Sequence, residues 1–360
     1  MKKRLIIYFN YHPNGQADAA CRFAVQQMAA VGQVFFVNNG PLQPESRQWA
    51  QGCCHTVLER ENTGFDVGAY RDAVLQTGLD MLLHYDEVVL MNYTLAGPVG
   101  DVAAMFAAMD GRPELDFWGL TRHYAMRSHR FGGAKAMVPE HIQSHFVVVR
   151  SRMMADFFAY WQAAALPASY EDSVRLHETQ FTAHFAALGY RWDTFVDTKD
   201  LASLFVNPIM ACPKLLLADR GCPFFKRRSF FTPYADELRR TDGRAAAELY
   251  DYLKSETDYP VDDLLRALLP VQPKHTGNLC WRGRAAAAHG PNPALALYPA
   301  ANGGGVCAHF AGCQHFGKRL RPAAGCRLLP AAAACCRGGG LLLCPVYANQ
   351  PAAGPGGRTV

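Results

Sequence analysis

Apolar and polar positions follow two different periods along the first 270 residues of this 360-residue chain. Short apolar runs rich in β-branched and aromatic residues predict buried strands at 5–9, 34–37, 56–58, 87–91, 117–120 and 145–149. Apolar residues that recur every three or four positions predict helices at about 21–28, 69–84, 102–109, 154–161, 173–188, 245–254 and 261–269. Because strands and helices alternate, we expect an α/β fold with a mainly parallel sheet flanked by helices on both faces.

The composition changes toward the end of the chain. The first part shows no internal repeat and no linker, so we expect one domain over residues 1–270. From about Arg284 the chain consists mostly of Ala, Gly, Pro, Cys, Arg and Leu, without a helical or strand period. We interpret residues 271–360 as a low-complexity tail, either an unstructured basic extension or the product of out-of-frame translation of GC-rich DNA. A zinc site there is disfavoured, because the cysteine and histidine spacing matches no zinc motif.

Charge follows the same division. All 31 acidic residues lie at or before Asp263, together with 26 of the 36 basic residues. The net charge of +5 is therefore a property of the tail, and the predicted domain is mildly acidic. A nucleic-acid partner is not expected, since it would need basic residues clustered on the fold.

Three features bear on where the protein acts. Five of the twelve cysteines lie in the predicted domain without the spacing of a disulfide scaffold, which fits a reducing cytosol. The apolar run at 5–9 is too short for the core of a signal peptide. No stretch approaches the ~18 uninterrupted apolar residues of a membrane-spanning helix. We therefore expect a cytoplasmic protein.

The first candidate site follows the third predicted strand, at residues 60–70 (RENTGFDVGAY). Ligands of doubly wound sheets bind beyond the carboxyl ends of the strands. Gly64 and Gly68 would let the backbone approach a ligand closely, and the N–H groups of the following helix would bind phosphate or hydroxyl groups. Asn62 and Asp66 add polar side chains to this turn. The structural alternative is that Asp66 serves only as the N-cap of that helix.

The second candidate is residues 91–98 (MNYTLAGP), directly after a buried strand. Asn92 and Thr94 would bind ribose hydroxyls or a metal-bridged diphosphate. The alternative is an Asx turn that leads into Gly97 and Pro98. The segment contains no carboxylate, so a divalent cation would lack its usual ligand here.

The third candidate is Glu178, which shares a helical stripe with Val174, Phe181, Phe185 and Leu188. A carboxylate on an inward face must be paired, or its pKa rises and it becomes useful as a base. Glu178 is therefore a candidate for the catalytic base. The alternative is a partly exposed residue near the helix start, where the helix dipole favours negative charge.

Two further clusters carry possible chemistry. His141, His145 and His177 would form a metal set only if they shared one face, and structural roles are favoured for them. The consecutive cations Lys226, Arg227 and Arg228 stand beside aromatic residues and would bind a diphosphate. A solvated basic edge is the alternative for these cations.

Four blocks in order, at 60–70, 91–98, 141–146 (HIQSHF) and 222–230 (CPFFKRRSF), resemble the rhamnan synthesis protein F family of bacterial polysaccharide glycosyltransferases. The resemblance covers roughly residues 5–269. It implies a GT-A-like (Rossmann-like) fold and transfer of a sugar, often rhamnose, from a nucleotide diphosphate donor to a growing glycan. The implied partners are a dTDP-rhamnose-like donor and a glycan acceptor. Peripheral association with the membrane machinery for polysaccharides such as lipopolysaccharide, at the inner face of the bacterial membrane, stays open.

The arrangement is also similar to inverting GT-A enzymes at large. In those enzymes an Asn-x-Gly segment lines the nucleotide pocket, and Asn62 and Gly64 match it. A helix supplies the base about eleven residues before a Gly-Tyr pair, and Glu178 stands eleven residues before Gly189. The segment at Asn92 stands where an Asp-x-Asp-type motif would hold metal and diphosphate, but the aspartates are absent. A Mg²⁺ or Mn²⁺ cofactor therefore stays open, and the cations that begin at Lys226 would neutralise the diphosphate instead.

The sequence thus predicts an inverting hexosyl transferase with Glu178 as its base. The expected substrate-binding residues are Asn62, Gly64, Asp66, Gly68, Asn92, Thr94, His145, Lys226 and Arg227. The alternative is a non-catalytic carbohydrate- or nucleotide-binding module of a polysaccharide assembly complex, which the missing acidic pair and the aberrant C-terminus favour. A nicotinamide dehydrogenase is disfavoured, because no Gly-x-Gly-x-x-Gly turn follows the first strand.

Overall fold

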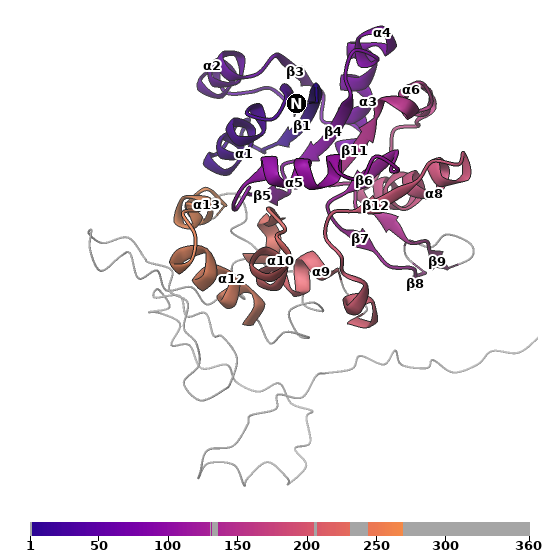
Figure 1. The fold of residues 1–360 in the computed structure, drawn as a ribbon. Coiled ribbons are helices and arrows are strands. Elements are labelled where there is room, and N and C mark those ends of the chain that lie inside the picture. The colour runs from indigo at the N-terminus through magenta and orange to yellow at the C-terminus, as the bar shows by residue number, and fades with distance from the viewer. Residues whose placement is uncertain (1, 130, 132–135, 205–206, 231–243, 269–360) are drawn as a thin grey trace, which may run out of the picture. The chain divides into compact units, whose positions relative to one another are not determined.

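A seven-stranded sheet forms the centre of the protein in a computed structural model that describes residues 2–129, 131, 136–204, 207–230 and 244–268 (Figure 1). The strands are β1 (Arg4–Tyr11), β2 (Gln33–Asn39), β3 (Thr56–Arg60), β4 (Glu87–Asn92), β6 (Phe117–Gly119), β11 (Phe146–Arg150) and β12 (Trp192–Thr194). Their order is β12-β6-β11-β4-β1-β2-β3. β11 runs antiparallel to both neighbours, and the other pairs are parallel. The mainly parallel, GT-A-like α/β fold that the sequence predicts is confirmed.

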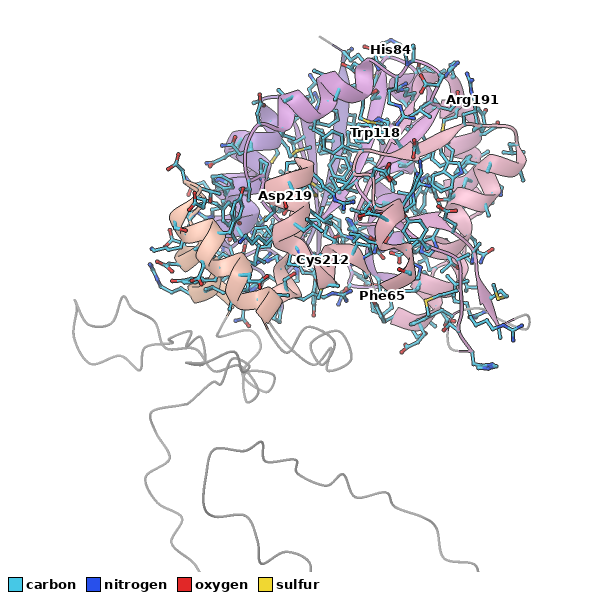
Figure 2. The ribbon with its side chains drawn as sticks, turned by 60° about the horizontal axis from the view of Figure 1, so that its bottom comes forward. Phe65, His84, Trp118, Arg191, Cys212 and Asp219 are labelled. Carbon is cyan, nitrogen blue, oxygen red and sulfur yellow. The ribbon has the colours of Figure 1, made fainter. Side chains whose placement is uncertain are left out.

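The two ends of the parallel strands define two rims of the sheet, the carboxyl rim and the amino rim. Helix α3 (Phe65–Thr77) begins five residues after β3 ends, so its start lies at the carboxyl rim. His84 precedes β4 and therefore lies at the amino rim, and the two labelled side chains Phe65 and His84 stand far apart in Figure 2. The strand order reverses between β1 and β4, which is the position where open α/β sheets bind ligands.

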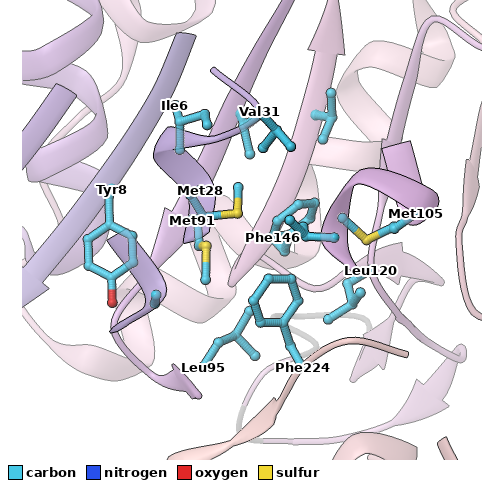
Figure 3. Packing of buried hydrophobic residues seen from close by; sticks show 14 of the residues in the cluster. Ile6, Tyr8, Met28, Val31, Met91, Leu95, Met105, Leu120, Phe146 and Phe224 are labelled. Carbon is cyan, nitrogen blue, oxygen red and sulfur yellow. The ribbon is translucent and has the colours of Figure 1, made fainter. Parts of the chain in front are cut away.

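Helices cover both faces of the sheet, because alternate residues of each strand point to opposite sides. Ile6 and Tyr8 of β1 belong to a buried cluster (Figure 3) that includes α1 (Ala19–Ala29), α2 (Pro44–Cys53), α5 (Val102–Asp110), α9 (Pro208–Ala211) and α10 (Pro213–Arg220). Leu5, Ile7 and Phe9 of the same strand belong to a second cluster with α3, α4 (Leu79–Leu82), α6 (Met154–Ala163) and α8 (Thr179–Ala187). The expected two-sided cover is confirmed.

Short strands outside the seven-stranded sheet pair with one another. Strand β5 (Leu95–Ala96) pairs with β13 (Phe225–Lys226), β7 (Arg122–His123) with β10 (His141–Ile142), and β8 (Met126–Arg127) with β9 (Met137–Val138). Short 3₁₀-helical segments are η2 (Ser151–Met153), η4 (Lys199–Leu204) and η5 (Arg227–Phe230). The closing helices α12 (Arg244–Ser255) and α13 (Val261–Leu268) pack around Phe225 and Phe230 in a third cluster. These pairings bring distant loops to one place.

Several helices differ from their predictions. The helix expected at about 69–84 begins at Phe65 and is interrupted at Gly78, whose φ of +77° breaks it into α3 and α4. Helix α2 was not predicted, because its buried residues are only Ser46 and Ala50 and no apolar stripe marks it.

The helix predicted at 173–188 consists of three segments. It begins as α7 (Tyr170–Asp172), widens into the π-helical η3 (Ser173–Glu178) and continues as α8. Phe181 and Phe185 are buried as expected, but Leu188 is 54% exposed, so the predicted stripe is wrong at its last position. Glu178 is the last residue of the π-helical segment, a conformation that is frequent at functional sites.

Residues 271–360, which we interpret as a low-complexity tail, lie outside the described residues. Within the part of the chain that the structure describes, no helix combines the length and the apolar character needed to cross a bilayer.

Candidate functional site

A cavity of about 1210 Å³ opens at the carboxyl rim of the sheet. Its lining comes from the ends of β1 and β4, the start of α3, the η3 segment, β10 and β13. Pockets for one drug-sized ligand measure roughly 300–1,000 Å³, so this cavity has room for more than one small substrate.

The cavity brings together seven of the ten predicted site residues: Asn62, Asp66, Asn92, Thr94, His145, Glu178 and Lys226. Gly64, Gly68 and Arg227 are not in its lining. The seven come from five segments that are far apart in the sequence, and the sheet rim is the feature they share.

The turn before α3 is held by the protein's own atoms. The Arg60 guanidinium donates to Thr63 O at 2.9 Å and to Asn39 Oδ1 at 2.7 Å. A Cβ on Gly64 would lie 2.9 Å from a Leu166 methyl group, and one on Gly68 would lie 2.3 Å from Thr63 O. These glycines therefore permit a close approach of the chain to itself at this turn.

Two polar side chains leave this turn toward the cavity. Asn62 Oδ1 accepts a hydrogen bond from Asn39 Nδ2 at 3.1 Å, which orients the Asn62 amide. The N-cap of α3 is Gly64, so the interpretation of Asp66 as an N-cap is wrong. Asp66 lies in the first turn, where its Oδ1 accepts from Val67 N at 3.1 Å and its second oxygen remains for other partners.

The loop after β4 is an Asx turn, the structural alternative that the sequence left open. Asn92 Oδ1 accepts from Thr94 N at 3.2 Å and from Thr94 Oγ1 at 2.5 Å. Thr94 Oγ1 in turn accepts from Lys226 Nζ at 2.9 Å. Because β5 pairs with β13, this lysine reaches a loop 132 residues earlier in the chain.

The three consecutive cations have different partners. Lys226 is buried at the cavity wall, and burial together with the charge of Arg228 lowers its pKa to about 7. Arg227 points to the other side, where it pairs with the buried Asp18 and donates to Tyr93 O at 3.3 Å. Arg228 lines the cavity again. The structure therefore gives Arg227 an anchoring contact outside the cavity lining.

Glu178 points into the cavity and is 24% exposed. Its Oε2 accepts from the Ser144 hydroxyl and from Ser144 N at 3.2 Å, and its Oε1 lies 3.8 Å from His141 Nε2. Burial alone would raise the pKa of Glu178, but the His141 and Ser144 hydrogen bonds and the charges of His141 and Lys226 lower it. Glu178 is thus paired and held ionised.

Asp66 behaves in the opposite way. Burial and the nearby negative charge of Glu178 raise the pKa of Asp66 to about 6. Its Oδ2 lies 3.5 Å from Ser144 Oγ, so one serine stands between the two carboxylates. Displaced pKa values of this kind are frequent where groups exchange protons.

The histidines do not converge on a metal. His145 bonds Thr121 Oγ1 at 3.3 Å, and burial, followed by the charge of Lys226, lowers its pKa well below the usual value. His177 is held by Tyr160 OH and Ala165 O, at 3.2 and 2.8 Å. Among the described residues, no group of three or more His, Cys, Asp or Glu is arranged to hold a metal ion.

Sequence reasoning missed two parts of this site. Ser144 lies within the 141–146 block, which was the signal that could have found it. The second part is an aromatic wall, formed by Phe9, Tyr11, Tyr70, Tyr93, Tyr160 and Trp161. Apolar periodicity marks such residues as buried but does not say which of them border a cavity.

A sheet of this order, with a cavity at its switch point that is lined by carboxylates and the buried Lys226, is of the GT-A-like class of α/β folds. The model of the family described as rhamnan synthesis protein F matches residues 34–279. The chain belongs to this family, which confirms the resemblance seen in the sequence.

Individual relatives are distant. A Sinorhizobium fredii protein described as uncharacterized protein y4gN is 23% identical over 210 residues, which cover 56% of this chain and 51% of that protein. The chain thus spans about half the length of this curated relative.

Two solved structures are similar at low level. A mannosyltransferase from Pyrobaculum calidifontis, in complex with GDP-Man and Mn²⁺, is 12% identical with a TM-score of 0.34, over 80% of this chain and 76% of that one. Glucosyl-3-phosphoglycerate synthase from Mycobacterium tuberculosis, in complex with Mn²⁺, UDP-Glc and phosphoglyceric acid, is 10% identical with a TM-score of 0.29, over 42% and 58%. Likenesses of this size carry no argument about the reaction of this chain.

Proposed function

We propose that the protein is a glycosyltransferase that moves a sugar, rhamnose, from a nucleotide diphosphate donor to a growing cell-surface polysaccharide, with inversion at the anomeric carbon. Membership of the rhamnan synthesis protein F family supports this class of reaction. The observation that carries the proposal is that Glu178 and Lys226 line one cavity. A proton acceptor and a cation for the leaving group are the two groups that such a transfer needs.

In this proposal the donor lies between the α3 turn and the end of β4. Asn62, Asp66, Asn92, Thr94 and His145 supply its polar contacts. The glycines of the turn and Arg227 act indirectly, because they hold the segments that carry these side chains. The aromatic wall offers flat faces for the nucleobase or the sugar rings.

The end of β4 does not fit a divalent cation. Asn92 Oδ1 is bonded by Thr94, Thr94 Oγ1 accepts from the Lys226 ammonium, and neither side chain is a carboxylate. We expect Lys226 and Arg228 to supply the positive charge for the leaving diphosphate. Addition of EDTA should then leave turnover unchanged. Loss of turnover in EDTA and recovery with Mn²⁺ would show that this role of Lys226 is wrong.

The reaction is a single displacement. Glu178 takes the proton of the acceptor hydroxyl, and that oxygen forms a bond to the anomeric carbon. The bond between this carbon and the diphosphate oxygen breaks, and the nucleoside diphosphate leaves with the electron pair. Because attack and departure occur on opposite sides of the carbon, its configuration inverts.

Titration of the full chain with dTDP-rhamnose, UDP-glucose and GDP-mannose tests the function. Calorimetry measures donor affinity, and chromatography measures the nucleoside diphosphate released with a rhamnose-containing glycan or with water as acceptor. We expect dTDP-rhamnose to bind most tightly and to be turned over. Binding of a donor without turnover would favour the alternative, a non-catalytic binding module. Absence of binding to all three donors would contradict the proposed transfer.

A further inference from the structure

Ser144 stands between the two carboxylates of the cavity. The Ser144 hydroxyl donates to Glu178 Oε2, and Ser144 Oγ lies 3.5 Å from Asp66 Oδ2. A hydroxyl has one hydrogen and two acceptor lone pairs. It can therefore accept from one carboxyl group while it donates to the other, which is the arrangement that passes a proton between them.

We propose that Glu178, Ser144 and Asp66 form a proton relay, in which the proton that Glu178 takes from the acceptor hydroxyl ends on Asp66. This inference rests on the proposed function, since the acceptor belongs to the transfer reaction. When Glu178 Oε2 is protonated, the Ser144 hydroxyl turns toward Asp66. Glu178 then gives its proton to Ser144 Oγ while Ser144 gives its own to Asp66 Oδ2. Glu178 is ionised again, Ser144 keeps one hydrogen, and Asp66 is neutral.

The surroundings make this direction favourable. Burial and the charge of Glu178 raise the pKa of Asp66, whereas His141, Ser144 and Lys226 together lower the pKa of Glu178. A proton is therefore more stable on Asp66 than on Glu178. Glu178 alone would be a weak base that readily returns the proton to the acceptor, and the relay removes this difficulty.

Other titratable groups face the pair from every neighbouring element. Asp66 interacts with Glu178 on η3, Lys226 on β13, Tyr70 on α3 and Tyr93 after β4. The groups around Glu178 are His141 on β10, His123 on β7, His145 before β11, and Lys226. Burial raises the pKa of Tyr70 well above its usual value and that of Tyr93 to about 12, so neither tyrosine competes for the proton near neutral pH.

Kinetics of Ser144→Ala and Asp66→Asn test the relay. In the wild type, kcat should fall as the pH drops through about 6, because Asp66 is then already protonated and accepts no further proton. Ser144→Ala should lower kcat ~10-fold or more with donor affinity retained, a part of what a positioned proton acceptor contributes, and Ser144→Thr should restore it. Asp66→Asn should lower the plateau and remove the fall near pH 6. Wild-type kcat in Ser144→Ala, or an unchanged pH profile in Asp66→Asn, would overturn the relay.

Two matched variants control for loss of a hydroxyl or a carboxylate. Thr77→Ala removes a hydroxyl that bonds Ala73 O at the far end of α3, and Asp80→Asn neutralises an exposed carboxylate on α4. Both should retain the wild-type kcat and pH profile. A loss in Thr77→Ala as large as that in Ser144→Ala would show that the effect is not specific to the hydroxyl between the two carboxylates.

Infrared spectroscopy of the substrate-free protein separates failure of the relay from failure of the proposed function. A band of a protonated carboxyl should appear with a midpoint near pH 6 and be absent in Asp66→Asn. Its frequency should shift in Ser144→Ala, because the protonated Asp66 loses its acceptor, and its midpoint should fall in Glu178→Gln. A band indifferent to Ser144→Ala would overturn the relay even in a fully active transferase. If no donor is turned over, these spectra still decide whether Ser144 couples the two carboxylates.

Discussion

Two buried ionic clusters lie at the two ends of the central strands, and they differ in how completely their charges are matched. At the amino end, the fully buried Glu87 accepts from Arg4 Nε at 2.7 Å, from Arg150 Nε at 3.1 Å and from Lys2 Nζ at 2.9 Å. Arg150 donates its other N–H groups to three backbone carbonyls, those of Met109, Arg112 and Leu115. These partners complete the pairing of Glu87 and Arg150 in the amino-end cluster.

The cluster at the carboxyl end is open to the cavity. Asp66, Glu178 and Lys226 line it, and the pKa values of Asp66 and Lys226 are displaced to about 6 and about 7. The comparison shows that complete pairing of buried charges removes their capacity to bind a substrate or to exchange protons. Charges whose partners are all internal hold strands together, whereas charges that lack a full set of partners keep capacity for a substrate and for protons.

The largest effect that would separate the clusters is expected from Glu178→Gln. The amide cannot take a proton, so kcat should fall by about 10²–10⁴-fold, while donor affinity stays nearly unchanged. The free energy of unfolding should fall as well, because the amide keeps a hydrogen-bond acceptor for Ser144 but loses the charge that His141 and Lys226 stabilise. Steady-state kinetics, calorimetry with the donor and urea unfolding measure the three quantities.

Glu45→Gln is the matched control, since the Glu45 side chain is 81% exposed and pairs only at the surface with Arg22. It should be indistinguishable from the wild type in kcat. Unchanged turnover in Glu178→Gln would remove Glu178 as the base.

The converse change is Glu87→Gln at the amino end. Loss of this charge leaves the buried Arg150 guanidinium without its carboxylate and the buried Arg4 with Asp110 alone, so we expect the protein to lose about 3–5 kcal/mol of unfolding free energy. Donor affinity per folded molecule should be retained. Lys254→Met, which breaks the exposed pair with Asp262, should cost at most about 1 kcal/mol. Urea unfolding of the three proteins measures these values. Equal losses in the two variants would mean that burial of the amino-end cluster does not matter.

Lys226→Met sharpens the comparison through pH. The folded pKa of Lys226 is about 7, below the ordinary value near 10.4, so the unfolded chain binds more protons between these two values. Wild-type stability should therefore gain a contribution as the pH rises from about 7 to 10, and Lys226→Met should lack it. We also expect kcat to fall about 10²-fold, since the cation for the leaving group is lost.

Urea midpoints at several pH values and steady-state kinetics check this prediction. Lys214→Met, at an exposed position of α10, provides the control and should follow the wild type in both. A wild-type stability profile that is flat across this pH range would refute the low pKa of Lys226.

The smallest effect is expected from Asn39→Ala, which removes the amide that orients Asn62. Donor affinity should weaken several-fold, in line with loss of a hydrogen bond worth about 0.5–1.5 kcal/mol. Asn38→Ala is the matched control, because Asn38 is equally buried but bonds Asn10 and Gly40 O. It should lose comparable stability and keep the donor affinity. Equal affinities in the two variants, measured by calorimetry, would leave Asn39 with a structural role alone.

Much of the fold was predictable because its signals are local. Runs such as 34–37 and 87–91 are strands since consecutive apolar side chains suit a sheet buried on both faces. Helices α2, α9 and α10 had no predicted counterpart, and the mostly polar residues of α2 carry no periodic signal. The site was predictable in its location but not in its contacts. Loops at strand ends converge by topology, whereas the partner of each side chain depends on packing between distant segments.

By itself, the sequence determined the alternating elements, the rim where the polar loops meet and the presence of carboxylates and cations there. Only the tertiary structure decided that Lys226 lies in the cavity and the next residue, Arg227, on Asp18. It also decided that Ser144 stands between Asp66 and Glu178. The physical reason is a difference in the distance along the chain over which the two kinds of information extend. Hydrophobic periodicity depends on near neighbours in the sequence, whereas burial and charge pairing depend on every segment packed against a residue.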